Sequence, residues 1–364
     1  AEALYLNAIN IRKFAIGSFH PNYASSLYSL GRLYRKTGDY ERSKVYFEEA
    51  LSIYEKSYGQ LHPTYANATS ELGILMQSMG QYTLAEAYLT QTINLRRNIY
   101  GNQHRQLAES YNNLGSLYQA IGNFEKAEKN YQQAEKIFEK TLGHQDPDYA
   151  AVLNNLGDFY VEVLDFDKAR PYYERALKIF EQAYGAQHPL YANTLNNIAS
   201  LNRKTGSFKE AEQLYLKTLK VDEQTVGKNH PSYATSLNNL AILYVATKRY
   251  QKAEPLYLES IKIKEATLGK NHPSYAKSLN NLALMYMTLE DFHKAEPLFL
   301  EAISNQLYQI NTIFPALTEK EREAFYNTLR SDLERFNTFA VLHSLDNPSI
   351  VGEMFNNQLT TKAL

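Results

Sequence analysis

The sequence predicts an all-α fold, a solenoid of stacked helical hairpins, and three observations carry that prediction. The segment that begins at Lys228 is repeated from Lys270, 42 residues later, and this period runs through most of the 364 residues. Each period contains two stretches in which apolar residues recur every three or four positions, as on one face of a helix. Glycine, histidine and proline return at fixed places between these stretches, where helices end and begin. Self-similarity at one period decides the architecture before any single residue does.

Four kinds of position keep this period without insertion. A glycine closes each unit at Gly17, Gly59, Gly101, Gly143, Gly185, Gly227 and Gly269. Three residues later come His20, His62, His104, Asp146, His188, His230 and His272. A very small residue stands in each first helix at Gly31, Gly73, Gly115, Gly157, Ala199, Ala241 and Ala283. Another stands in each second helix at Ser43, Ala85, Ala127, Ala169, Ala211, Ala253 and Ala295. We expect these small residues where the paired helices cross, because larger side chains would push the axes apart.

The first helix of a unit is illustrated by residues 231–245. Pro231 suits the first helical position, where its missing N–H costs nothing, and His230 then occupies the N-cap. Asp146 fills this slot in another unit, and aspartate is a strong N-cap acceptor. The inner face is then made of Tyr233, Leu237, Leu240, Ala241 and Tyr244.

The second helix of the same unit is predicted over about residues 251–267. Its inner face carries Ala253, Leu256, Tyr257, Ser260, Ile261 and Ile263. Gly269 is expected to end it in the left-handed αL conformation. Three units have a proline near this start, and we place Pro171, Pro255 and Pro297 in the first turn, where proline is tolerated.

The pattern L-G-x-L-Y…G-x-F/Y…A…Y…A resembles the tetratricopeptide repeat. It is carried by Leu114, Gly115, Leu117, Tyr118, Gly122, Phe124, Ala127, Tyr131 and Ala134. The unit is longer than the usual 34 residues, and this variant resembles the repeats of kinesin light chains and of many bacterial multi-repeat proteins. The resemblance covers residues 1 to about 304 and implies a right-handed superhelix of a half repeat and seven full repeats. The opening AEALYLNAIN matches the second half of a unit, so we expect a fragment of a longer protein.

Residues 305–364 leave the repeat and are predicted to form capping or linker helices. Thr318 and Glu321 have the spacing of a capping box, and a long helix should follow to about His343. Asn347 and Pro348 begin another helix, whose apolar stripe is Ile350, Val351, Met354, Phe355 and Leu359. This tail resembles the segment that joins such repeats to a caspase-like CHAT peptidase domain in bacterial proteins. The resemblance implies that the chain is the sensing or regulatory arm of a larger CHAT protein, with the peptidase beyond residue 364.

Composition excludes several classes of site and partner. The formal net charge is −1, which gives no reason to expect nucleic acid or an anionic membrane as partner. The chain has no cysteine, hence no thiolate metal site and no cysteine nucleophile. The regular histidines stand a whole repeat apart, whereas zinc ligands must converge on one ion. We therefore expect no metal, no cofactor and no enzyme activity in this chain. No apolar run is long enough to span a membrane, and we expect a cytoplasmic protein.

The most regular polar feature is an asparagine doublet in the first helices. Asparagine disfavours helix interiors because its amide competes with the backbone, so five doublets require a reason. The resemblance implies that the first helices line a concave groove, where the second asparagine pairs with the backbone of an extended peptide. Ser29 and Glu71 replace it in the first two full units. We predict a peptide site from Asn113, Asn155, Asn197, Asn239 and Asn281, together with their neighbours Asn196, Asn238 and Asn280. The alternative is that the amides satisfy neighbouring helices or face water.

Other residues of this face suggest what the groove prefers. Arg203 and Lys204 in one unit, like Arg32 and Arg35 in the first, would favour an acidic peptide or a carboxylate terminus. Solvated side chains are the alternative. An apolar stretch from Ile242 to Met287 would hold hydrophobic anchors, or lie beneath the C-terminal helices.

Three functions remain open on the sequence. The leading prediction is a protein-interaction scaffold that binds a peptide or protein segment and regulates an attached caspase-like domain. The second is a cargo or assembly adaptor, similar to kinesin light chain, without an enzyme. The third is a self-association module whose groove holds the protein's own tail. The oligomeric state is open as well.

Overall fold

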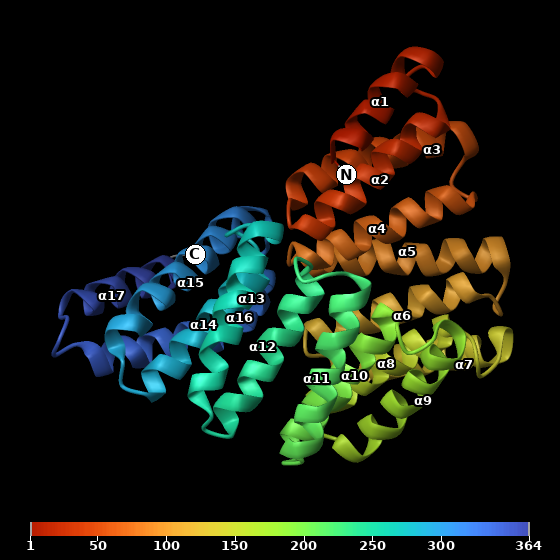
Figure 1. The fold of residues 1–364 in the computed structure, drawn as a ribbon. Helices are drawn as coiled ribbons and strands as arrows, with labels where there is room; N and C mark the ends of the chain where they lie inside the picture. The colour runs from red at the N-terminus through yellow and green to blue at the C-terminus, as the bar shows by residue number, and fades with distance from the viewer. Residues whose placement is uncertain (1, 363–364) are drawn as a thin grey trace. The chain divides into compact units, whose positions relative to one another are not determined.

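The structure is a computed structural model that describes residues 2–362. Those residues form α-helices, one short 3-10 helix and no strand, and successive helices pair as hairpins (Figure 1). The chain divides into two compact units between residues 179 and 180, inside helix α9. The all-α hairpin architecture is therefore confirmed. None of the described helices is both long and apolar enough to cross a membrane.

The helix bounds follow the period closely. Before the division lie α1 (Glu2–Ile16), α2 (Pro21–Thr37), α3 (Tyr40–Tyr58), α4 (Pro63–Ser78), α5 (Tyr82–Tyr100), α6 (Arg105–Ala120), α7 (Phe124–Leu142) and α8 (Pro147–Glu162). Helix α9 spans Phe166–Tyr184. After it come α10 (Pro189–Lys204), α11 (Phe208–Thr225), α12 (Pro231–Ala246), α13 (Tyr250–Leu268), α14 (Pro273–Thr288), α15 (Phe292–Ile313), η1 (Phe314–Ala316), α16 (Glu319–His343) and α17 (Ser349–Lys362).

The first helices begin where the histidines cap them. The imidazole Nδ1 of His230 accepts a hydrogen bond from the backbone N–H of Ser232 at 3.1 Å. The same bond recurs at the other five histidines of the slot. In the remaining unit, Asp146 Oδ1 accepts from Asp148 N at 2.8 Å. The predicted N-caps are confirmed, and the capping nitrogen is occupied as an acceptor.

The glycines that end the second helices differ from the prediction in their conformation. Gly59 has φ 77° and ψ 170°, which is not the αL region. Gly38, which ends a first helix, has φ 82° and ψ 6° and is αL. Positive φ with extended ψ is essentially restricted to glycine. Glycine is therefore required here, as expected. Its backbone is extended in ψ and not αL, because the chain must span a loop from the end of the second helix to the next histidine.

Small residues bring the two helices of a hairpin into contact. A Cβ added to Gly115 would lie 2.9 Å from the ring of Tyr131, and one added to Gly31 would lie 2.9 Å from Phe47. Ser43 uses its small size differently, because its hydroxyl donates to the carbonyl of Gly31 at 2.8 Å. The predicted helix crossings are confirmed at these positions.

The prolines of the second helices lie deeper than predicted. Helix α13 starts at Tyr250 and α9 at Phe166, so Pro255 and Pro171 fall in the second turn and not the first. The earlier start arises because Tyr250 packs against the apolar core and joins the helix. Each proline then leaves one carbonyl of the first turn without its helical N–H partner.

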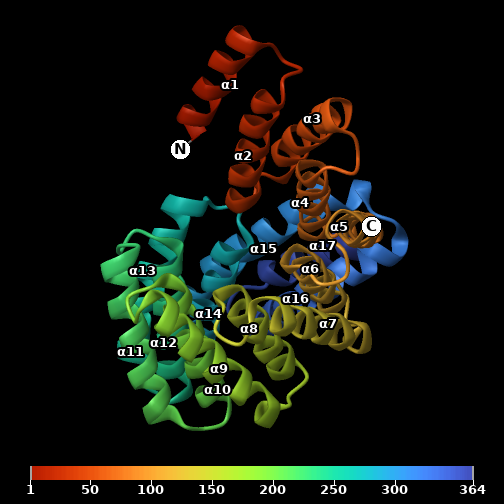
Figure 2. The same ribbon diagram turned by 90° about the vertical axis from the view of Figure 1, so that its right-hand side faces the viewer.

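Helices α16 and α17 cover the last hairpin, as Figure 2 shows. Phe336 and Phe339 of α16 and Ile350 of α17 belong to the same buried cluster as Phe299 and Ala302 of α15. The capping box is present, with Thr318 N donating to Glu321 Oε2 at 3.0 Å. The side chain of Leu359, assigned to the stripe of α17, lies outside the described residues. Helix α15 runs through residue 304, where the sequence suggested that the solenoid ends.

The first helices form one layer in each unit. Helices α2, α4, α6 and α8 contact one another in series before the division, and α10, α12 and α14 do so after it. We call the surface of these layers the first-helix face. It carries the predicted asparagines and the charged residues beside them.

Candidate functional site

The two asparagines of a doublet have different surroundings in four of the five doublets, and Asn112 and Asn113 are both partly exposed. Asn154, Asn196, Asn238 and Asn280 are buried, each 7% exposed or less. The second members, Asn113, Asn155, Asn197, Asn239 and Asn281, are partly exposed on the first-helix face. This difference follows from helix geometry, because neighbouring residues point about 100° apart.

The doublets of consecutive repeats bind each other. Asn155 Nδ2 donates to Asn112 Oδ1 at 2.9 Å, and the donor and acceptor are 43 residues apart. The same bond joins Asn239 to Asn196 at 3.3 Å and Asn281 to Asn238 at 3.1 Å. The alternative that the amides satisfy neighbouring helices therefore holds for one hydrogen of Asn155, Asn239 and Asn281. A carboxamide has a further hydrogen and an oxygen with two lone pairs, so these side chains keep hydrogen-bonding capacity beyond this bond.

The series ends at Asn280. Both polar atoms of its side chain are buried and have no hydrogen-bond partner among the described residues. The position 43 residues later is Glu323, in the exposed surface of α16, instead of a second asparagine. The unsatisfied amide is thus explained by the end of the repetition.

The arginines of the first repeat are already paired within the protein. Arg32 Nε lies 3.3 Å from Glu71 Oε1, and Arg35 Nη2 lies 3.1 Å from Glu71 Oε2. Glu71 occupies the slot of a second asparagine. Its carboxylate offsets one of the two positive charges, which weakens the attraction that this end of the face would have for an acidic peptide.

Arg203 and Lys204, predicted to favour acidic ligands, also differ from each other. Arg203 is partly buried. It lies close enough to the hydroxyl of Tyr215 to lower that pKa, against the larger effect of burial, which raises it. Lys204 is exposed. Of the two, Lys204 is better placed to meet a ligand.

The apolar stretch is half-buried. Ile242, Val245, Leu284 and Met287 pack against the core cluster that also contains Phe336 and Phe339. They contribute to the support of the first-helix face as well as to its surface.

A pocket of about 290 Å³ lies on the first-helix face before the division. Its wall includes Ser116, Gln119, Tyr131, Asn155, Asp158 and Glu162. These residues come from α6, α7 and α8, and Gln77 of α4 completes the wall, where its amide donates to Ser116 Oγ at 3.3 Å. One predicted residue, Asn155, lies in it together with two carboxylates, Asp158 and Glu162, which the sequence places on the same helix face without predicting that they bind.

Hydrogen bonds hold the pocket side chains in place. Tyr173 donates its hydroxyl to Asp158 Oδ1 at 2.6 Å. Tyr131 donates to Gln119 Oε1 at 2.8 Å, and Gln119 Nε2 donates to Glu162 Oε2 at 2.5 Å. Burial raises the pKa of Asp158 to about 6, while the Tyr173 bond lowers it and the nearby Glu162 charge raises it. The two carboxylates are thus close enough to repel each other.

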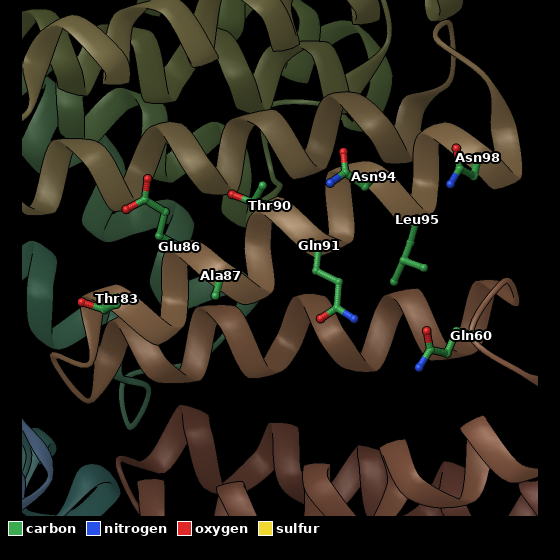
Figure 3. Close-up of a pocket in the computed structure, with 9 residues that line it drawn as sticks. All are labelled: Gln60, Thr83, Glu86, Ala87, Thr90, Gln91, Asn94, Leu95 and Asn98. Atoms are coloured by element: carbon green, nitrogen blue, oxygen red, sulfur yellow. The ribbon is translucent and has the colours of Figure 1, made fainter.

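A second pocket, of about 560 Å³, lies along α5 (Figure 3). Its polar residues are Gln60, Thr83, Glu86, Thr90, Gln91, Asn94 and Asn98. The carboxylate of Glu86 accepts the hydroxyl of Tyr118 at 2.5 Å. The remaining polar groups are neutral amides and hydroxyls, and no expectation from the sequence fell on this surface.

A family model described as tetratricopeptide repeat matches residues 1–56, 64–140, 148–224, 194–266 and 232–306. Such repeats are typically non-catalytic interaction modules. No curated protein matches the chain.

Solved structures give the same architecture. A Rap protein complexed with Competence and Sporulation Factor is 15% identical with a TM-score of 0.55, over 93% of this chain and 99% of that one. A STAND protein with a tetratricopeptide repeat sensor, from Pyrococcus horikoshii, is 18% identical with a TM-score of 0.52, over 88% and 50%. BtubC (BKLC) from P. vanneervenii is 24% identical with a TM-score of 0.51, over 65% of this chain and 92% of that one.

Proposed function

Because the chain belongs to the tetratricopeptide repeat family, we propose that it binds a peptide or protein segment along its first-helix face. The series of second asparagines carries the proposal. Each is partly exposed, and in three of them the bond to the preceding repeat fixes the side chain. The remaining amide hydrogen and the oxygen face a segment whose backbone both donates and accepts. Binding of this kind depends little on the sequence of the segment.

The similar structures support this reading by analogy. The Rap protein is described in complex with Competence and Sporulation Factor, and the Pyrococcus protein is described as having a tetratricopeptide repeat sensor. A similar face on this chain would receive a segment of a partner and report its presence.

The finer proposal is that this chain is the regulatory arm of a larger CHAT protein. It rests on the resemblance of the tail, and on that alone. The native mass tests it, by an antibody against this chain on the source cells. A band far above 41.8 kDa, with peptides from a Cys- and His-containing region after Leu364, supports the proposal. A band only slightly larger contradicts it and favours the adaptor.

Peptide binding is tested by replacing Asn197, Asn239 and Asn281 with alanine together. The probe is a mixture of short fluorescent peptides with acetylated N-termini and amidated C-termini, followed by fluorescence anisotropy. We expect the wild-type chain to bind and the triple variant to lose at least about tenfold in affinity, since each tenfold corresponds to about 1.4 kcal/mol.

The matched control replaces Asn94 and Asn98, exposed asparagines on α5 away from this face. It should bind as the wild type does. Circular dichroism and melting temperatures confirm that all variants fold. Equal binding by the triple variant, or no binding by the wild type, contradicts the proposal.

A further inference from the structure

The pocket lined by α4, α6, α7 and α8 is chemically unlike the same place in neighbouring repeats. Asp158 occupies the slot that holds Ser116 one repeat earlier and Ser200 one repeat later. Glu162 occupies the slot of Ala120 and of Lys204. The first-helix face therefore has two carboxylates at one place, where other repeats carry neutral or basic residues.

Several hydrogen-bond donors that line or adjoin the pocket already bond to other groups of the protein. Tyr131 donates its hydroxyl hydrogen to Gln119, and Gln119 donates an amide hydrogen to Glu162. Tyr173 donates its hydroxyl hydrogen to Asp158, and Asn155 donates an amide hydrogen to Asn112. A carboxylate offers about four lone-pair directions, more than these bonds use at Glu162. The other residues that line the pocket, among them Gln77 and Ser116, are neutral, so the two carboxylates make the wall favour a ligand that donates.

The charges of the two carboxylates also favour a ligand that donates hydrogen bonds, and in particular a cation. Asp158 is partly buried behind Glu162, which is exposed at the rim, and each carboxylate raises the cost of ionising the other. A cation between them relieves that repulsion and replaces lost hydration of Asp158. Arginine and lysine supply such a cation on a long apolar stem that can enter a pocket of this size.

We propose that the pocket of Asp158 and Glu162 receives the lysine or arginine side chain of the segment bound along the first-helix face. This inference rests on the proposed function and adds a basic anchor residue to it. Asn155 binds the backbone beside the anchor, Glu162 pairs with the cation at the rim, and Asp158 pairs with it inside. The preference is the opposite of the acidic ligand that Arg203 and Lys204 suggested.

The test uses peptide mixtures that differ only in one fixed central residue: lysine, arginine, glutamate or alanine. All are acetylated at the N-terminus and amidated at the C-terminus, so that no terminal ammonium supplies the positive charge. Fluorescence anisotropy with the full chain measures affinity at low and high salt. We expect the lysine and arginine mixtures to bind about tenfold more tightly than the alanine mixture, and the advantage to shrink in high salt.

Two variants take residues from neighbouring repeats, so the fold is known to accommodate them at these slots. Asp158→Ser copies Ser116 and Ser200, and Glu162→Lys copies Lys204. We expect the first to remove the preference for basic peptides and the second to transfer it to the glutamate mixture. Circular dichroism and melting temperatures confirm that both variants fold.

The outcomes separate the two proposals. Equal binding of all four mixtures by the wild type overturns the basic anchor and leaves peptide binding intact. Preference for the glutamate mixture overturns it too. Binding of none of the mixtures overturns both proposals. A preference for basic peptides that survives Asp158→Ser and Glu162→Lys places the anchor elsewhere and overturns the assignment of this pocket.

Discussion

At the residue scale, the same amide has opposite energetic value at different places. Asn238 accepts a hydrogen bond from Asn281 in the next repeat, whereas Asn280 has no partner for either polar atom among the described residues. A buried polar group without a partner costs about 1–3 kcal/mol. Position in the series, and not residue type, decides whether the amide stabilises the protein.

We therefore expect Asn280→Leu to stabilise the protein by about 1–3 kcal/mol, because it removes an uncompensated desolvation cost. The matched change Asn238→Leu should destabilise it by about 1 kcal/mol, since it removes the acceptor of Asn281. Urea midpoints measure both. A lower midpoint for Asn280→Leu would contradict the view that its amide is unsatisfied.

Lys264 is a buried cation whose charge costs stability. It is 3% exposed, and its ammonium donates to Ser278 Oγ at 2.8 Å and to the carbonyl of Ser274 at 3.3 Å. Burial, with a smaller effect of Lys277, lowers its pKa from 10.5 to about 8. Phe138 fills the corresponding slot in another repeat, so an apolar side chain fits there.

We expect Lys264→Met to raise stability near pH 7 by about 2–3 kcal/mol, because one pKa unit corresponds to about 1.4 kcal/mol. The unfolded chain binds more protons than the folded one between pH 8 and 10.5. The free energy of unfolding of the wild type therefore rises relative to that of the variant as pH rises through that window, and the difference between the two becomes smaller. Lys262→Met, exposed on the same helix, is the control and should show no such change. Melting temperatures at pH 7, 8.5 and 10 measure this change. If the difference in melting temperature between Lys264→Met and the wild type is the same at all three, the buried charge does not cost stability.

At the element scale, the histidine caps make the stability of a helix N-terminus depend on the protonation state of an imidazole. Each of six histidines accepts a backbone N–H at Nδ1. Protonation removes that acceptor and places a positive charge at a helix N-terminus, where the helix dipole disfavours it. At His272, burial and the charge of Lys264 lower the pKa, which keeps that cap neutral to a more acidic pH. Asp146 caps its helix with a carboxylate in place of an imidazole.

We expect His272→Asp to reduce the fall in melting temperature between pH 7.5 and 5.5, because the lowered pKa of His272 means that the unfolded chain binds a proton there at a higher pH than the folded one, which costs stability as pH falls. Each cap is worth about 1 kcal/mol. The reverse change, Asp146→His, should enlarge the fall. If all three proteins lose the same number of degrees, the caps do not govern acid stability.

At the scale of the whole molecule, each unit builds its core from hairpins that cannot bury their apolar faces alone. In the second unit, α16 and α17 take the place of a further repeat and cover Phe299 and Ala302. They supply the apolar contacts of a repeat but not its asparagine, since Glu323 stands where the second asparagine would be. The cap therefore closes the core and leaves the amide of Asn280 unsatisfied.

The sequence by itself determined the period, the helix starts and the small residues at the crossings. These features depend on bonds and contacts of short range, such as His230 to Ser232, that each repeat makes in the same way. It also led to the family, because the pattern is spread over seven units. It placed Pro255 in the first turn of its helix, where the structure has it in the second, and it gave Gly269 an αL conformation, where the structure has ψ 163°. Tertiary packing and the loop to the next helix set these details.

Only the tertiary structure decided how the residues of the first-helix face are used. The bonds Asn155–Asn112 and Arg35–Glu71 join residues 43 and 36 positions apart, and the offset between packed helices selects them. The same offset brings Gln119 of one helix to Glu162 of the next and so forms the acidic pocket. A sequence shows which side chains share a helix face, but their partners across repeats depend on the distance and rotation at which neighbouring helices pack.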